Sequence, residues 1–236
     1  MYKLTSTFIA ASMALAAAGG ASAAVIPLDG FDTPFAPNPL ATTAGTVVSM
    51  TVITPGGNVF DRTTTLTVDS NSNGAPSGAN VRTDSGDAVL SNDTGVASVL
   101  TFSYDVDGVV NDAQTGSATG SLRIVEKFAD RPRTYTFSLN GIEQDTNVQL
   151  IDTEFGFARE IFLSFSTALL TGDDTFALEI DAGAAGVSLG DALDLEIALL
   201  DIIIPEIPPQ VPAPGALGLL GLGALALGAA RRRKAT

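Results

Sequence analysis

The chain has 236 residues, of which 26 are acidic and 12 basic, so its formal net charge at pH 7 is −14. It contains no cysteine, histidine or tryptophan. This composition excludes disulfides, thiol nucleophiles, Ser–His catalysis and metal sites built on cysteine or histidine. The negative charge disfavours contact with a phosphate backbone, so we expect no nucleic-acid partner.

The N-terminal residues have the pattern of a secretory signal peptide. Lys3 supplies a positive charge, an apolar stretch runs from Phe8 to Ala18, and Ala21–Ala23 forms a small-residue cleavage site. A segment of this kind is removed during export and takes no part in the fold. We therefore predict a signal peptide over residues 1–23 and an exported mature chain that begins at Ala24.

Residues 24–204 have the length of one domain, and apolar and polar residues alternate along much of it. The clearest runs are Leu100–Val106, Tyr135–Leu139, Phe176–Ile180 and Leu193–Leu199, and weaker runs lie at 46–53, 59–68, 121–128, 147–153 and 161–166. Turn residues such as Asn140-Gly141 separate the runs. Alternation of period two is typical of antiparallel sheets with one solvated face. We predict an all-β, two-sheet antiparallel β-sandwich of jelly-roll type, with about eight or nine short strands.

One loop of the predicted domain is a candidate calcium site. Asp69, Asn71 and Asn73 alternate ahead of Gly74, as in the first half of a calcium-binding loop. The twelfth position of such a loop holds Asn80 where a bidentate glutamate is expected, and no helical pattern flanks it. Asparagine and serine are also ordinary turn formers. Both interpretations stay open, and we expect no other cofactor.

Carboxylates alone can hydrolyse glycosides, and two acidic residues of this chain begin the pattern of such a site. The Glu-x-Asp-x-x-Glu strand pattern of retaining β-sandwich glycosidases begins at Glu179 and Asp181, but Ala184 occupies the last acidic position. The chain also lacks tryptophan, the usual platform for a sugar ring. We therefore predict a noncatalytic protein.

The C-terminal residues form three segments. Residues 205–214 are a proline-rich linker, residues 215–230 an apolar run, and residues 231–236 a basic tail. As a helix the 16-residue run reaches about 24 Å, and extension back to Val211 with snorkelling arginine stems brings it close to the hydrocarbon thickness of about 30 Å. We predict one short transmembrane helix with a cytoplasmic tail; the alternative is a buried core helix.

A short motif precedes this run. Val211, Pro212, Ala213 and Pro214 stand before the apolar segment, and Arg231, Arg232 and Arg233 follow it. This arrangement resembles the PEP-CTERM sorting signal of Gram-negative bacteria that produce exopolysaccharide, in a variant with Ala213 at the glutamate position. The resemblance implies processing by an exosortase-type enzyme, a transient anchor in the inner membrane, and transfer to the cell surface or extracellular matrix.

Two functions are consistent with these features. The first is a noncatalytic structural role in the envelope, in exopolysaccharide or in biofilm. The second is a carbohydrate-binding module, with calcium at the Asp69 loop as an option. Strongly acidic composition between residues 24 and 210, where 26 acidic residues face seven basic ones, favours neutral or cationic polymers as partners.

Overall fold

A computed structural model describes residues 23–106, 119–150, 157–182 and 193–205. These residues belong to one compact unit, Ala23–Pro205. The predicted signal peptide lies outside the described residues except for Ala23, and so do the sorting motif, the apolar run and the basic tail. Within the described ranges, no helix is long and apolar enough to cross a membrane.

The described residues form thirteen strands in two sheets, together with the 3-10 turns η1 (Pro55–Gly57) and η2 (Thr167–Leu169). Sheet A has the order β11 (Arg159–Ser166), β8 (Thr119–Ala129), β13 (Leu193–Pro205), β6 (Asp87–Asn92), β5 (Ala79–Asp84) and β2 (Leu40–Ala41), and β1 (Ala23–Asp29) also pairs with β13. Sheet B has the order β10 (Ile142–Gln149), β9 (Arg133–Leu139), β12 (Thr175–Asp181), β7 (Val96–Asp105), β4 (Phe60–Asn71) and β3 (Gly45–Ile53).

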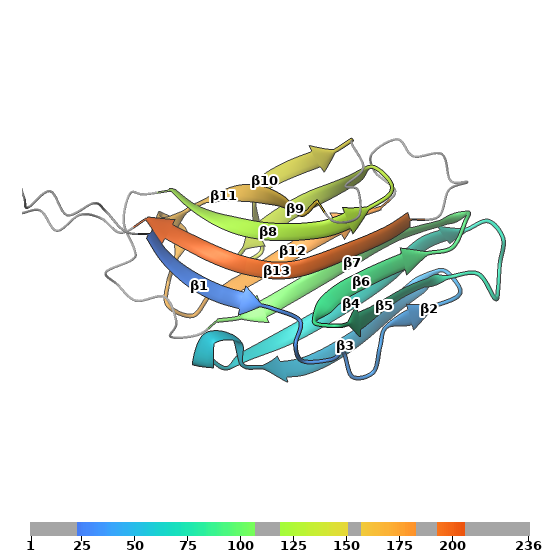
Figure 1. Ribbon diagram of the computed structural model, residues 1–236, viewed down its shortest axis with the longest axis horizontal. Coiled ribbons are helices and arrows are strands. Elements are labelled where there is room, and N and C mark those ends of the chain that lie inside the picture. The colour runs from blue at the N-terminus through green and yellow to red at the C-terminus, as the bar shows by residue number, and fades with distance from the viewer. Residues whose placement is uncertain (1–22, 107–118, 151–156, 183–192, 206–236) are drawn as a thin grey trace, which may run out of the picture. The chain divides into compact units, whose positions relative to one another are not determined.

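Every strand pair in both sheets is antiparallel. Figure 1 shows β1, β13 and β8 side by side in one layer, with β12 and β7 in the other. The predicted all-β, two-sheet antiparallel sandwich is therefore confirmed.

The alternation of the sequence places the core between the sheets. In β7 the side chains of Leu100, Phe102 and Tyr104 are buried, whereas Thr101 and Ser103 are partly exposed on the other face. Aromatic rings from both sheets meet in this core: Phe137 and Phe176 of sheet B each lie within 5.8 Å of Phe165 of sheet A, between ring centroids. Burial of such apolar area stabilises the sandwich by about 25 cal/mol per Å².

The sequence predicts about eight or nine strands, fewer than the thirteen that the described residues form. The structure adds β1, β2, β5 and β6, none of which lies in a predicted run. Strand β6 lacks an alternating pattern because five of its six residues are buried. Strand β1 begins at Ala23, the last residue of the predicted signal peptide, and its Ala24 pairs with Ile204 in β13. Pairing with the last strand therefore holds the start of the described chain.

Candidate functional site

The outer face of sheet B is rich in threonine and serine side chains. Its four central strands point alternate residues away from the core, and nine of these residues are threonine or serine: Thr63, Thr65, Thr67, Thr101, Ser103, Thr134, Thr136, Ser138 and Thr175. We call this set the hydroxyl face. Because their inward neighbours are apolar or buried, the strand period fixes which residues face outward.

Strand registers align these hydroxyl groups in rows across the sheet. One row runs from Thr65 through Thr101 and Glu179 to Thr136. The next runs from Thr63 through Ser103 and Ala177 to Ser138. Neighbouring strands lie about 4.8 Å apart, so the rows form a regular array of hydrogen-bonding groups.

Charge is divided unequally between the two sheets. Among the described strands, the basic side chains that face solvent from the outer face of a sheet all belong to sheet A: Arg82, Arg123 and Lys127. Two of them pair with acids: Arg123 with Asp201 and Glu160, and Lys127, whose Nζ lies 2.6 Å from Asp87 Oδ2. The outer face of sheet B instead carries exposed acids, including Asp61, Asp105 and Glu179. That face therefore attracts cationic groups and repels polyanions, and it does not repel neutral groups.

A buried ion cluster joins the two sheets near one edge. Arg62 of β4 donates from Nη1 to Asp29 Oδ2 of β1 at 2.8 Å, and from Nη2 to the carbonyl of Thr33 at 2.8 Å. The hydroxyl of Tyr104 in β7 donates to Asp29 Oδ2 at 3.0 Å. The guanidinium also stacks on Phe35, 4.3 Å from the ring centroid. We call Asp29, Arg62 and Tyr104 the Asp29 cluster.

Burial controls ionisation in the Asp29 cluster. Desolvation raises the pKa of Asp29 above its ordinary value of 3.8, although the charge and hydrogen bond of Arg62 oppose that shift. Desolvation and the neighbouring Asp29 raise the pKa of Tyr104 well above 10.0. The tyrosine therefore stays protonated and acts as a hydrogen-bond donor.

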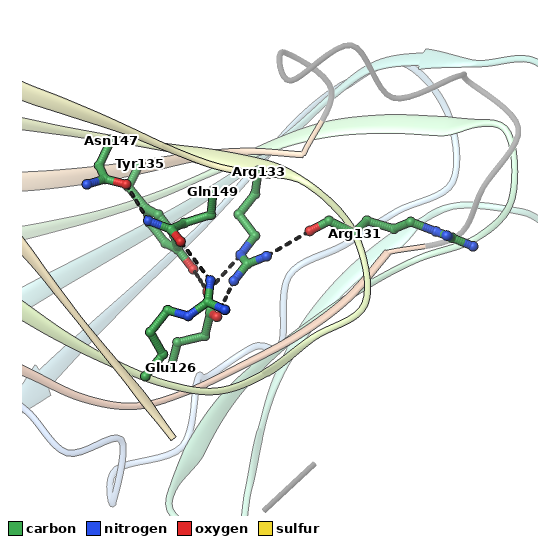
Figure 2. A network of polar contacts seen from close by, with 7 residues as sticks. Glu126, Arg131, Arg133, Tyr135, Asn147 and Gln149 are labelled. Carbon is green, nitrogen blue, oxygen red and sulfur yellow. Dashed lines mark hydrogen bonds and ion pairs between the residues drawn. The ribbon is translucent and has the colours of Figure 1, made fainter. Parts of the chain in front are cut away.

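A second cluster repeats this chemistry with residues from other strands. Figure 2 shows Glu126 of β8 facing Arg133 and Tyr135 of β9. Arg133 Nε donates to Glu126 Oε2 at 2.7 Å, and Tyr135 donates to the same oxygen at 2.5 Å. Arg133 Nη2 donates to the other carboxylate oxygen, and its Nη1 donates to the carbonyl of Arg131. Burial, followed by the charge of Glu126, raises the pKa of Tyr135 well above 10.0. We call Glu126, Arg133 and Tyr135 the Glu126 cluster.

In both clusters the carboxylate comes from sheet A, and the arginine and tyrosine come from sheet B. Asp29, Glu126 and the two arginines are at most 2% exposed. Each carboxylate is paired with an arginine that neutralises it. The clusters therefore join the two sheets through buried ion pairs.

A small cleft adjoins the Asp29 cluster. Its volume is about 170 Å³, and it is lined by Asp29, Gly30, Asp32, Thr33, Ile53, Thr54 and Pro55. The part of the chain described here contains no group of three or more acidic side chains that could hold a metal ion. The cleft thus offers polar contacts to a small molecule but no multidentate carboxylate site.

In the predicted calcium loop, the side chains of Asn71 and Asn73 form hydrogen bonds with backbone groups of the protein. The Asn71 amide donates to the carbonyls of Thr42 and Ser77 at 2.9 and 2.6 Å, and its Oδ1 accepts from the backbone of Asn73 at 3.1 Å. The Asn73 amide donates to the carbonyl of Thr94 at 2.6 Å. Asp69 is exposed near the end of β4. These contacts brace the loop, and calcium binding there stays a prediction.

The two carboxylates compared with a glycosidase site lie together on β12. Glu179 is exposed and Asp181 partly exposed, both on the outer face of sheet B. Ala184, where a third acid would be needed, lies outside the described residues. The residues that sequence reasoning missed are those of the two buried clusters, although arginine at inward positions of β4 and β9 was a visible signal.

Comparison with known families identifies the C-terminal segment. Residues 210–234 match the PEP-CTERM protein-sorting motif. The chain carries a PEP-CTERM sorting signal. The predicted motif residues Val211, Pro212 and Pro214 and the basic residues Arg231–Arg233 lie within this match. The signal implies export, membrane-associated sorting in Gram-negative bacteria and an exosortase-type processing enzyme.

Comparisons of the whole chain give weaker likenesses. No curated protein matches the chain. A family 29 carbohydrate-binding module from Piromyces equi is 7% identical, with a TM-score of 0.38 over 80% of this chain and 96% of that one. A family 11 carbohydrate-binding module of a Clostridium thermocellum cellulase is 13% identical, with a TM-score of 0.31 over 78% and 96%. At these values the likenesses say nothing about a ligand or an activity of this chain.

Proposed function

We propose that this chain is a noncatalytic protein of the cell surface or extracellular matrix, exported through its signal peptide and processed by an exosortase-type enzyme. The match of residues 210–234 to the PEP-CTERM motif carries this proposal. Strand β13, the last described strand, ends at Pro205, and the matched segment begins five residues later, at residue 210. In this proposal the sorting signal directs the β-sandwich domain to the surface or matrix, where the domain has a structural role in envelope, exopolysaccharide or biofilm.

The noncatalytic part of the proposal rests on the chemistry of the side chains. The chain has neither histidine nor cysteine, which removes the commonest general bases and thiol nucleophiles. Asp29 and Glu126 are buried against arginine. Glu179 and Asp181 stand on the open outer face of sheet B.

Cell fractionation tests the sorting step. The wild-type protein is expected in the surface or matrix fraction, whereas Pro212→Ala/Pro214→Ala is expected to accumulate in the inner membrane. The matched control is Pro208→Ala/Pro209→Ala, which alters two prolines outside the matched segment and is expected to sort as the wild type. Equal distribution of all three proteins would refute exosortase-dependent sorting through this motif.

The hydroxyl face supports a second candidate function, binding of a neutral or amino-bearing polysaccharide. Its threonine and serine hydroxyls both donate and accept hydrogen bonds, and the acids beside them disfavour anionic glycans. Retention on cellulose, chitosan and alginate tests this candidate, and we expect binding to the first or second but not the third.

A pair of substitutions locates the binding face. Thr101→Lys places a long charged side chain at the centre of the hydroxyl face, and Ser121→Lys places the same side chain on the outer face of sheet A. We expect the first to reduce retention and the second to leave it unchanged. Absence of retention on all three polymers, or equal behaviour of the two variants, would exclude this candidate.

A further inference from the structure

Strand β3 is an edge strand of sheet B with no visible protection. Its nine residues, Gly45–Ile53, include no charged residue and no proline. Among the described residues, it forms backbone hydrogen bonds with β4 alone. Natural sandwiches usually protect an edge with charged residues, proline, a bulge or a covering segment, because free N–H and C=O groups pair with another chain.

The opposite side of the sandwich is protected. Strand β10, the other edge of sheet B, carries Glu143 and Asp145 and has an irregular register between them. Side chains of β10 also cap backbone N–H groups of β11, the neighbouring edge of sheet A: Asp145 Oδ2 accepts from Ser164 at 2.8 Å. At the far edge of sheet A, β2 has only two residues. Strand β1 pairs with β13 alone, but it contains Pro27. A long edge without charged residues or proline is therefore particular to β3 among the described edges.

The outward residues of β3 form an apolar row. Val48, Met50 and Val52 are 51%, 71% and 59% exposed. Their neighbours on β4 are Thr65, Thr63 and Asp61, so the apolar row stops at the edge of the sheet. A second β-strand could hydrogen-bond to the free backbone groups of this edge and bury its apolar row, which water cannot do.

The sequence of β3 is complementary to itself in antiparallel orientation. Ser49 is the fifth of its nine residues, so a pair of β3 strands centred on Ser49 places Val48 opposite Met50 and Thr46 opposite Val52. All four of these positions point to the outer face. Such pairing obeys two-fold symmetry, which gives a closed dimer instead of an open filament.

Charge favours the same arrangement. The chain is strongly acidic, so two copies repel each other over most of their surfaces. The neutral β3 edge allows close approach with little repulsion between groups in direct contact. Added salt screens the remaining repulsion between the two domains, because the Debye length at 0.1 M ionic strength is about 10 Å.

We propose that β3 is a self-association edge, through which two copies of this chain pair antiparallel about Ser49 and join their B sheets into one continuous sheet. The occupant of the edge is a second copy of the chain. This proposal stands on the geometry of the sandwich and holds whether or not the C-terminal signal is processed as described above.

Sedimentation velocity of the full chain, purified in non-ionic detergent, tests the association. We expect a dimer that strengthens with salt, and we expect Met50→Lys to weaken it by about tenfold or more. Ile142→Lys is the matched control, because Ile142 is a similarly exposed apolar residue on β10, and it should dimerise as the wild type. A monomeric wild type, or equal dimerisation of Met50→Lys, would overturn the proposal.

Cysteine cross-linking tests the register, because the chain contains no cysteine of its own. Val48→Cys and Met50→Cys should form a disulfide dimer when the two variants are mixed and oxidised. Each variant alone should cross-link poorly, because its own two cysteines are offset along the strands and exceed the Cα separation of about 7 Å that a disulfide spans. Equal cross-linking in the mixture and in the separate samples would refute pairing about Ser49.

Discussion

The carboxylate of Asp145 in β10 accepts a hydrogen bond from the backbone N–H of Ser164 in β11 at 2.8 Å. This bond joins the edge of sheet B to the edge of sheet A. Gln144 makes a longer contact of the same kind with the N–H of Ser166, at 3.4 Å. One side of the sandwich is thus closed by side chains, while β3 on the other side stays open.

Removal of the Asp145 carboxylate should expose this edge. We expect Asp145→Ala to accelerate hydrogen exchange at the Ser164 amide by about tenfold or more, because a bond to a charged acceptor contributes about 1.5–3 kcal/mol and every 1.4 kcal/mol is about tenfold. Asp145→Asn keeps an acceptor oxygen and should have a smaller effect. Unchanged exchange at Ser164 in Asp145→Ala would show that this bond does not protect the edge in solution.

Arg62→Met should destabilise the fold strongly. The substitution leaves the Asp29 carboxylate buried without its cation, and breaking a buried ion pair in this way costs about 3–5 kcal/mol. Arg82→Met is the control, since Arg82 is exposed on β5 and should change the free energy of unfolding by less than about 0.5 kcal/mol. Urea unfolding measures both, and equal effects would contradict a structural role for the Asp29 cluster.

Asp174 should make stability depend on pH. Burial raises the pKa of this carboxyl, but hydrogen bonds from Asn140, Thr171 and Gly172 outweigh it and lower the pKa below 3.8. The ionised group therefore stabilises the fold above the unfolded pKa, and this contribution is lost as pH falls through the folded pKa.

Asp174→Asn tests that dependence. We expect a loss of about 1–3 kcal/mol at pH 7 from the weakened hydrogen bonds, and a difference from wild type that shrinks steadily below pH 3.8. Asp173→Asn, at the exposed neighbouring position, is the control and should change the free energy of unfolding at pH 7 by less than about 0.5 kcal/mol. Unfolding curves between pH 2 and 7 measure the difference, and a constant gap between wild type and Asp174→Asn would contradict the assignment.

Gly78 and Gly30 differ in the space available for a side chain. A Cβ at Gly78 would lie 2.3 Å from the carbonyl oxygen of Ala41, whereas one at Gly30 would meet its nearest neighbour, Asp32, at 3.5 Å. We expect Gly78→Ala to lower the free energy of unfolding by about 1–3 kcal/mol through overpacking. Gly30→Ala should be tolerated, and a smaller loss in Gly78→Ala than in Gly30→Ala would contradict this packing.

Local pattern was sufficient to predict the sandwich but not the clusters inside it. Alternation alone identifies the inward face of β7, β9 and β12, because strand period and burial depend on nearby residues. The Asp29 cluster joins Asp29 to Arg62 and Tyr104, which lie 33 and 75 positions further along the chain. Only the topology of the two sheets brings such residues together, so no local pattern could pair them.

The same distinction applies to the functional surfaces. The sorting motif is a contiguous sequence signal, and a scan of residues 210–234 is enough to find it. The hydroxyl face draws its residues from four strands whose spatial order, β9-β12-β7-β4, differs from their order in the chain. Threonine in a single strand is an ordinary β-former, and the array emerges only when the registers are known.

Intact mass of the protein recovered from cells tests the central claim most directly. The account predicts a mature species that lacks residues 1–23 and the residues after Pro214, in a surface or matrix fraction. Pro212→Ala/Pro214→Ala should yield a species that keeps its C-terminal residues. A wild-type protein that retains Arg231–Thr236 would contradict processing at the motif and make the chain a C-terminally anchored envelope protein.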